Sequence, residues 1–313
     1  MNRNQYIPAR NKTIYFIGVT TGESSIMKVF PKWSEYLGLG ADIKGFDFLL
    51  HAPAQEYREV VEFIKKDPLS MGALVTTHKI DLYNSCKDMF DYLDPFAIQL
   101  GEISSISKQG NKLCGHAKDP ISSGLALEKF VPPNYWKNNS DSEVFLIGAG
   151  GAALAMGVYL TQECMGNNVP KKITIANRSE PRLESAKKIL NKLNSCTTFE
   201  FRHNPLPEDN DKILSSLPKG SLIVNATGLG KDSEGTPITD SAIFPENGMI
   251  WEINYRGNLV FMEQAQVQKT KQNLVIEDGW IYFIHGWTQV ISEVFHINID
   301  INQLEKLSAI ARA

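Results

Sequence analysis

The stretch from Val144 to Ala153, with the sequence VFLIGAGGAA, constrains the fold of this chain more than any other segment. Its apolar run leads directly into Gly148 and Gly150, and a helix-compatible segment, Leu154 to Cys164, follows. A strand, a tight glycine turn and a helix N-terminus together form a cradle for the pyrophosphate of a dinucleotide. The alternative is a structural glycine turn without a ligand. A second strand, expected at Ile173 to Ala176, favours cofactor binding.

Composition excludes several classes of protein. The chain has 313 residues, 42% of them hydrophobic, and a formal net charge of -3, which gives no electrostatic reason to expect nucleic acid or an anionic membrane as a partner. Its four cysteines are scattered, and its six histidines lack the spacing of metal ligands, so we expect reduced thiols and no metal. The polar N-terminus and the lack of long apolar stretches indicate a soluble, cytoplasmic protein. The oligomeric state stays open, with a homodimer as one option.

Strands and helices alternate in the N-terminal part, which predicts a mainly parallel sheet covered on both faces. Ligands of such sheets bind beyond the carboxyl ends of the strands, where Ser24 and Lys79 would lie. A hairpin is expected around Gln109-Gly110-Asn111, and a linker around residues 131–142. The expected strands are 14–18, 42–50, 72–75, 101–108 and 112–116, and the expected helices are 24–37, 54–64, one ending at Cys86, and 122–130.

The segment after the second strand of the glycine motif indicates which dinucleotide binds. Asn177-Arg178-Ser179 ends this strand, and Arg182 follows one turn later. NAD sites usually carry an acidic residue here, whereas an arginine favours the 2′-phosphate of NADP. The alternative is a surface helix cap with solvated arginines. A later strand, Leu222 to Asn225, precedes Ala226-Thr227-Gly228, a loop suited to line the nicotinamide side.

The resulting fold prediction is an α/β chain with two domains. Residues 1–130 would form an α/β substrate domain, and residues 131–278 a Rossmann NADP-binding domain. Residues 279–313 would form C-terminal helices that return to the first domain. The remaining elements expected are strands at 249–253 and 274–276 and helices at 280–295 and 301–311.

With these landmarks placed, the chain resembles the shikimate dehydrogenase family over nearly its whole length. The resemblance implies NADP-dependent interconversion of a ring ketone and a ring alcohol, as in 3-dehydroshikimate reduction in aromatic amino acid biosynthesis. The order and rough spacing of the matching motifs agree: FIG (16–18), VTTHK (75–79), GEISS (101–105), GHAKD (115–119), IGAGGA, ANRSEPR, VNATGLG, WEINY (251–255) and DGWIYFIHG (278–286).

Carried over from this resemblance, Lys79 matches the catalytic lysine of the family and Asp119 its catalytic aspartate. Hydride transfer to a ketone needs a proton donor at the developing alkoxide, and an ammonium group also stabilises that charge. A neighbouring carboxylate would orient the lysine and the reacting hydroxyl. Tyr255 matches a tyrosine of the substrate pocket, although an ordinary buried tyrosine is the alternative.

Most of the residues with which the family holds its substrate are changed. A site built for particular hydroxyls and a carboxylate loses affinity steeply when those partners are lost. We therefore expect a related cyclic polyol or hydroxy acid rather than shikimate, with Glu23, Glu102, His116 and Lys118 as polar groups near the altered positions. The changes are Ile26 for the second of two serines (Ser24 fits the first), Ala73 for an asparagine, Thr77 for a proline, Ser104 for the ring-hydroxyl asparagine, and Gly286 for a glutamine, with Gln289 nearly a turn away.

Two alternatives remain at this point: a true shikimate or quinate dehydrogenase with rearranged contacts, and a non-catalytic NADP-binding sensor. The predicted catalytic residues are Lys79 and Asp119, and the predicted substrate-binding residues are Ser24, Ser104, Tyr255 and Gln289. The predicted cofactor-binding residues are Gly148, Ala149, Gly150, Gly151, Ala152, Asn177, Arg178, Ser179, Arg182, Ala226, Thr227, Gly228 and Gly279.

Overall fold

The chain divides into two units in the computed structural model, which describes residues 6–193, 195–230 and 233–312. The first unit combines residues 1–118 with 286–313, and the second comprises residues 119–285. The unit boundaries therefore fall just before Asp119 and inside the helix that spans Trp280–Phe295. The domain limits predicted from sequence, at residues 130 and 278, lie elsewhere, because the loop at 131–142 looks more like a linker than the residues before Asp119 do.

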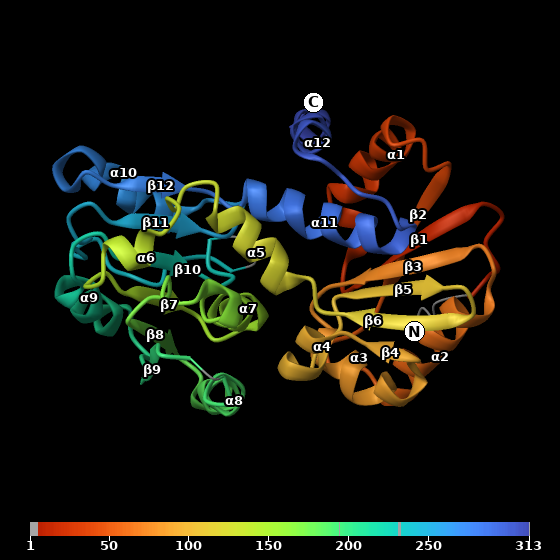
Figure 1. Ribbon diagram of the computed structural model, residues 1–313, viewed down its shortest axis with the longest axis horizontal. Helices are drawn as coiled ribbons and strands as arrows, with labels where there is room; N and C mark the ends of the chain where they lie inside the picture. Colours follow the sequence, from red (N-terminus) through yellow and green to blue (C-terminus); the bar gives the residue numbers. More distant parts are fainter. Residues whose placement is uncertain (1–5, 194, 231–232, 313) are drawn as a thin grey trace. The chain divides into compact units, whose positions relative to one another are not determined.

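The first unit is built on a six-stranded mixed sheet (Figure 1). Strand β1 pairs in parallel with β2 and β3, whereas β5 runs antiparallel to β3 and β6, and β4 pairs in parallel with β6. The antiparallel pair β5–β6 is the predicted hairpin, and Gly110 supplies the positive φ of its turn. In spatial order the strands are β2 (Ala41–Asp47), β1 (Lys12–Gly18), β3 (Ser70–Val75), β5 (Ser105–Gln109), β6 (Lys112–His116) and β4 (Tyr92–Leu93).

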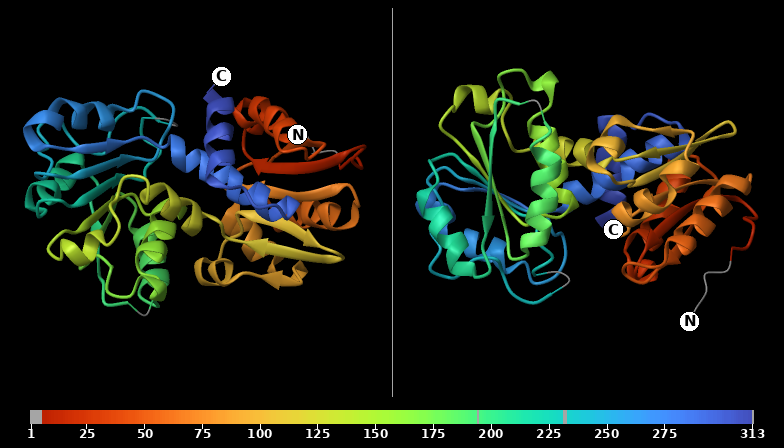
Figure 2. Two further views of the ribbon diagram at one scale, coloured as in Figure 1. Left: turned by 45° about the horizontal axis from the view of Figure 1, so that its top comes forward. Right: turned by 90° about the horizontal axis from the view of Figure 1, so that it is seen from below.

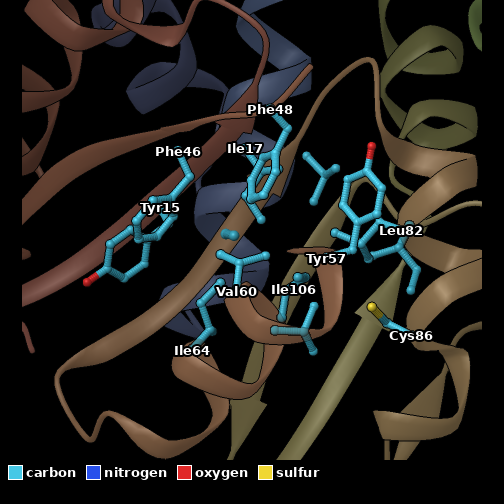
Figure 3. Close-up of a cluster of buried hydrophobic side chains, with 14 of the residues drawn as sticks. Tyr15, Ile17, Phe46, Phe48, Tyr57, Val60, Ile64, Leu82, Cys86 and Ile106 are labelled. Carbon is cyan, nitrogen blue, oxygen red and sulfur yellow. The ribbon is translucent and has the colours of Figure 1, made fainter. Parts of the chain in front are cut away.

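Helices cover both faces of this sheet. On one face, α2 (Ala54–Lys66) and α3 (Lys79–Cys86) bury apolar side chains against the strands, and Figure 3 shows Tyr57, Val60 and Ile64 of α2 directed at this core. On the other face lie α1 (Ile26–Tyr36) and the C-terminal half of α11 (Trp280–Phe295). There the rings of Phe16 and Trp287 meet edge to face at 5.1 Å.

The predicted return of the C-terminal helices is confirmed within the first unit. Helix α12 (Ile301–Arg312) packs on α1, and the indole Nε1 of Trp33 donates a hydrogen bond of 2.9 Å to the Leu307 carbonyl oxygen. Phe30 and Phe295 stack at 6.4 Å. The apolar stripe predicted for residues 24–37 is therefore the surface that receives the C-terminal segment.

The second unit is an all-parallel sheet in the order β12-β11-β10-β7-β8-β9. This order is that of a Rossmann fold, with the reversal of strand order between β7 and β10. The predicted α/β architecture with a Rossmann half is thus confirmed. The strands are β7 (Val144–Ile147), β8 (Lys172–Asn177), β9 (Thr198–His203), β10 (Leu222–Asn225), β11 (Met249–Glu252) and β12 (Val275–Glu277).

Helices lie on both sides of the sheet of the second unit, as Figure 2 shows. One core contains residues of α9 and α10 packed on Phe145, Ile223 and Ile250. On the other side, α5 contacts α7 so closely that a Cβ on Gly124 would lie 2.0 Å from the ring of Tyr159. The helices are α5 (Asp119–Leu127), α6 (Tyr135–Asn138), α7 (Gly151–Leu160), α8 (Glu180–Leu190), α9 (Pro207–Ser216) and α10 (Val260–Gln272).

Several predicted elements begin or end at other residues. Helix α7 starts at Gly151 rather than Leu154, because the small residues after the glycine turn are already helical. The strand expected at 101–108 spans residues 105–109 instead. Helix α4 (Pro95–Leu100) precedes it, capped by the Asp94 side chain, which accepts a hydrogen bond from Ala97 N. Strand β9 was not predicted, because it is a half-exposed edge strand with charged residues.

Candidate functional site

A cleft of about 340 Å³ opens at the carboxyl ends of the strands of the second unit, where the strand order reverses between β7 and β10. This is the place where open parallel sheets bind their ligands. The lining comes from four strand ends and one loop: residues 147–150 after β7, 176–178 with Arg182 after β8, 204–207 with Asn210 after β9, 226–229 after β10, and 233–237.

The glycine turn fits the pyrophosphate of a dinucleotide. Gly148 has a φ of +116°, and a Cβ there would lie 2.6 Å from the Ala226 carbonyl oxygen, so only glycine fits. At Gly150 an added Cβ would meet no atom within 4 Å, which leaves the backbone open to the cleft. Helix α7 begins at the next residue, so its unpaired N–H groups lie at the cleft, as anion binding requires.

Two arginines bring positive charge to the same cleft. Arg178 and Arg182 both line it, and both side chains are exposed. Within the part of the chain that the structure describes, neither guanidinium forms an ion pair with an acidic side chain. Glu234 adds a carboxylate to the lining. Asn177, at the end of β8, places an amide where NAD-specific folds usually carry an acid.

Four residues predicted to bind cofactor do not line the cleft: Gly151, Ala152, Ser179 and Gly279. Gly151 and Ala152 form the first turn of α7, and Ser179 is the residue before α8. Gly279 has a structural explanation, because a Cβ there would lie 1.9 Å from the Ile253 carbonyl oxygen. Their contact with a cofactor stays a prediction.

Sequence reasoning missed the lining after β9 and the loop at 233–237. A parallel strand always ends at the ligand edge, so recognising β9 from its alternating pattern would have placed Asn204 to Pro207 in the cleft. It also missed Glu252, a buried carboxyl at the end of β11. Its signal is a charged residue that follows three apolar residues and ends the strand.

Lys79 lies in the first unit as the first residue of α3, and its side chain is half-buried. The preceding His78 is fully buried, with its Nε2 3.2 Å from the Gly18 carbonyl oxygen and its Nδ1 2.9 Å from the Tyr57 hydroxyl. Burial lowers the pKa of His78, so the ring is neutral near pH 7. A neutral ring donates from Nε2 to the carbonyl and accepts the Tyr57 proton at Nδ1.

The residue directly before this histidine has a strained backbone. Thr77 has a φ of +57°, which is unusual for a β-branched side chain. The turn from β3 into α3 thus places the strained Thr77 next to the buried His78, whose ring makes two hydrogen bonds, and Lys79 follows directly. Such strain persists only where the surrounding structure enforces it, and it clusters at functional sites.

Asp119 begins α5 and opens the second unit, directly after Lys118 of the first. Lys118 is held at two points: its N–H donates to Ser104 Oγ at 2.7 Å, and its Nζ to Glu293 Oε2 at 2.6 Å. The other oxygen of Glu293 lies 3.2 Å from His116 Nε2. His116 and Lys118, expected near the altered substrate positions, are therefore engaged with α11.

The predicted substrate-binding residues are divided between the units. Ser24, Ser104 and Gln289 lie in the first unit and Tyr255 in the second. Ser24 and Gln289 are half-buried, whereas Ser104 is 2% exposed and accepts the Lys118 hydrogen bond. Tyr255 is half-buried, with its ring 4.5 Å from that of Phe283. Their contact with substrate stays a prediction.

Metal-ligand clusters and membrane-spanning helices are two further features of interest. Among the described residues, no group of three or more histidine, cysteine, aspartate or glutamate side chains is arranged to hold a metal ion. No helix in the described part of the chain combines the length and apolar character needed to span a membrane.

Comparison with known proteins finds relatives among the shikimate dehydrogenases. The chain is 27% identical over 166 residues to the shikimate dehydrogenase (NADP(+)) of Lactococcus lactis subsp. cremoris, a match that covers 53% of this chain and 54% of that protein. The first curated relatives are thus matched over only about half of their length. No family model matches the chain.

Solved structures match over nearly the whole chain. Quinate dehydrogenase from Corynebacterium glutamicum, in complex with NAD, has a TM-score of 0.74 at 16% identity and covers 95% of this chain and 98% of its own. The ligand-free 5-ketofructose reductase of Gluconobacter sp. strain CHM43 has a TM-score of 0.70 at 18% identity, covering 96% and 98%. At this identity the structures establish the fold, and the curated relative confirms the resemblance that the motifs predict.

Proposed function

We propose that this relative of the shikimate dehydrogenases is an NADP-dependent oxidoreductase that interconverts a ring ketone and a secondary alcohol. The observation that carries the proposal is the cleft of the second unit. Its lining joins the turn at Gly148, the open backbone at Gly150 and the exposed Arg178 and Arg182. These are the features that a pyrophosphate and a 2′-phosphate require.

NADP is favoured over NAD by the chemistry at the end of β8. A carboxylate there would repel a 2′-phosphate, whereas Asn177 is neutral and the two arginines supply opposite charge. Glu234 lies on the same lining and opposes this effect. Two cations against one anion leave the cleft lining with net positive charge.

Within this proposal, Lys79 and Asp119 carry the proton chemistry. The nicotinamide, when bound, supplies the hydride. Lys79 would donate a proton to the substrate oxygen and stabilise its developing negative charge, while Asp119 would orient the ammonium and the reacting hydroxyl. The anchored turn at His78 supports the assignment, because it fixes the backbone from which Lys79 extends.

We further propose that the substrate is a cyclic polyol or hydroxy acid other than shikimate. Ile26 and Ala73 stand where the family has substrate-binding polar residues, and both are fully buried in the first unit. Ser104 already accepts the Lys118 hydrogen bond. A carboxylate or ring hydroxyl of shikimate would find fewer partners. The fold itself does not fix the substrate, because one protein that shares it is named 5-ketofructose reductase.

The competing proposal is a true shikimate or quinate dehydrogenase, which the name of the curated relative favours. A non-catalytic NADP sensor is the third candidate, although it gives no reason for Lys79 and Asp119 to be present together. All three take a small-molecule ligand. We place the protein in the cytoplasm, where its free cysteines would stay reduced. Both a monomer and a homodimer are consistent with the proposal, and analytical ultracentrifugation would distinguish them.

A substrate screen separates these candidates. The purified protein is given NADPH and a panel of cyclic ketones that includes 3-dehydroshikimate, and NADPH absorbance is followed, with NADH in parallel. The proposal predicts turnover with NADPH and a better substrate than 3-dehydroshikimate. Efficient reduction of 3-dehydroshikimate above all others would establish the shikimate dehydrogenase alternative. Binding of NADPH without turnover of any ketone would support the sensor.

A further inference from the structure

A buried carboxyl lies behind the cofactor cleft rather than in its lining. Glu252, the last residue of β11, is 1% exposed. Its Oε2 accepts a hydrogen bond of 2.6 Å from Asn225 Nδ2. Its Oε1 accepts two more, from the Asn254 N–H at 2.9 Å and from Asn254 Nδ2 at 2.7 Å. All three partners are donors, which is the environment that an ionised carboxylate needs in a protein interior.

The two amides bonded to Glu252 extend this network to the cleft. Asn225 Oδ1 accepts from the N–H of Thr227 at 3.1 Å and from its Oγ1 at 2.6 Å. Asn254 Nδ2 also lies 3.2 Å from the Thr227 carbonyl oxygen and 3.3 Å from that of Leu229. The loop of residues 226–229, which lines the cleft, is therefore held from both sides by amides that Glu252 orients.

We propose that Glu252 is a positioning residue that fixes the loop at 226–229 in the conformation that binds the nicotinamide cofactor. The inference rests on the proposed function, since it assumes that the cleft binds such a cofactor. A buried amide that faces Thr227 with its oxygen needs an acceptor for its nitrogen to avoid an unpaired donor. Glu252 supplies that acceptor to Asn225, so its carboxylate determines which way the Asn225 amide points.

A hydrogen on the terminal group of residue 252 would conflict with the three hydrogen bonds that Glu252 accepts. A protonated carboxyl presents an O–H donor, and a glutamine presents an NH2 group, to partners that are themselves donors. Asn225 would then lose a hydrogen bond or turn its nitrogen toward the Thr227 N–H. Burial raises the pKa of Glu252 to about 7, while the hydrogen bonds from Asn254 and Asn225 oppose that rise. In the folded protein the Glu252 carboxylate is thus close to protonation at neutral pH.

The test compares the affinity for NADPH of four proteins by titration calorimetry, with thermal unfolding of each. The variant Glu252→Gln should bind NADPH about tenfold more weakly, because the loop loses a defined hydrogen bond. The double variant Asn225→Asp with Glu252→Gln should recover most of the affinity. In this double variant, the amide at position 252 can donate to the carboxylate at position 225 and still accept from Asn254. The carboxylate at position 225 can still accept from Thr227. The exposed Glu246→Gln is the matched control and should bind as the wild type does.

Wild-type affinity in a folded Glu252→Gln variant would overturn the proposal, and so would failure of the double variant to recover affinity. If Glu252→Gln does not fold, Asn254→Ala replaces it, because it removes the contacts to Thr227 and Leu229 while the backbone bond to Glu252 stays. It should also weaken NADPH binding, and unchanged affinity would contradict the inference. Failure of the proposed function would look different, since the wild type would then bind no NADPH or reduce no ketone.

Discussion

At the scale of single residues, the clearest test of cofactor choice is the pair Arg178 and Arg182. Replacing either by alanine should weaken NADPH binding about five- to tenfold, because each exposed guanidinium contributes about 1 kcal/mol toward a phosphate. Binding of NADH, which lacks the 2′-phosphate, should change little. Affinities measured by titration for both cofactors check this. An equal loss of affinity for NADPH and NADH would show that these arginines do not determine cofactor specificity.

Thr77 carries a second residue-scale prediction. Its φ of +57° suits glycine and is closed to proline, the residue at this position in the resembled family. Thr77→Gly should therefore keep the free energy of unfolding within about 1 kcal/mol of the wild type, whereas Thr77→Pro should lower it by more than that. Urea unfolding of the three proteins measures this. A Thr77→Pro protein as stable as the wild type would contradict the backbone conformation described for this turn.

At the scale of elements, Glu293 joins α11 to the end of β6. Burial alone would raise its pKa, but the Lys118 hydrogen bond and the charge of His116 lower it overall. A lowered pKa means that the ionised carboxylate stabilises the folded state above pH 4.5, its ordinary value, and that this contribution is lost as pH falls below it.

Glu293→Gln should therefore lower the free energy of unfolding by about 1 kcal/mol at pH 7, since the pair is only partly buried. The difference from the wild type should shrink at acidic pH. Urea unfolding at pH 7 and pH 4 measures both, with the exposed Glu305→Gln on α12 as control. A deficit that is the same at both pH values would show that the carboxylate charge does not stabilise this link.

The elements themselves were predicted well where the hydrophobic pattern was strong. Strand β10 and helix α11 have the predicted bounds, because β10 is a short apolar run and α11 is rich in apolar residues that follow Asp278-Gly279. The edge strand β9 and the short helices α4 and α6 were missed, since half-exposed or brief segments carry too few apolar residues to show a period. The Glu252 network was also beyond prediction, because hydrogen bonds between strand ends depend on tertiary structure.

At the scale of the whole molecule, the sequence predicts the cofactor half better than the substrate half. The backbone requirements of a dinucleotide leave a local motif around Gly148, and nine of the thirteen predicted cofactor residues line the cleft. The residues predicted to bind substrate are scattered along the sequence, in both units, so no local pattern records them. The burial of Ile26 and the engagement of Lys118 by Glu293 appear only in the folded chain.

The most direct test of the central claim is the Lys79→Ala variant, with Lys66→Ala on α2 as an exposed control. With the best ketone from the screen, Lys79→Ala should lose turnover by about 10²- to 10⁴-fold, the usual contribution of a general acid. Its affinity for NADPH should equal that of the wild type, because Lys79 is not among the residues that line the cleft. Turnover by Lys79→Ala at the wild-type rate would contradict the proposed reaction.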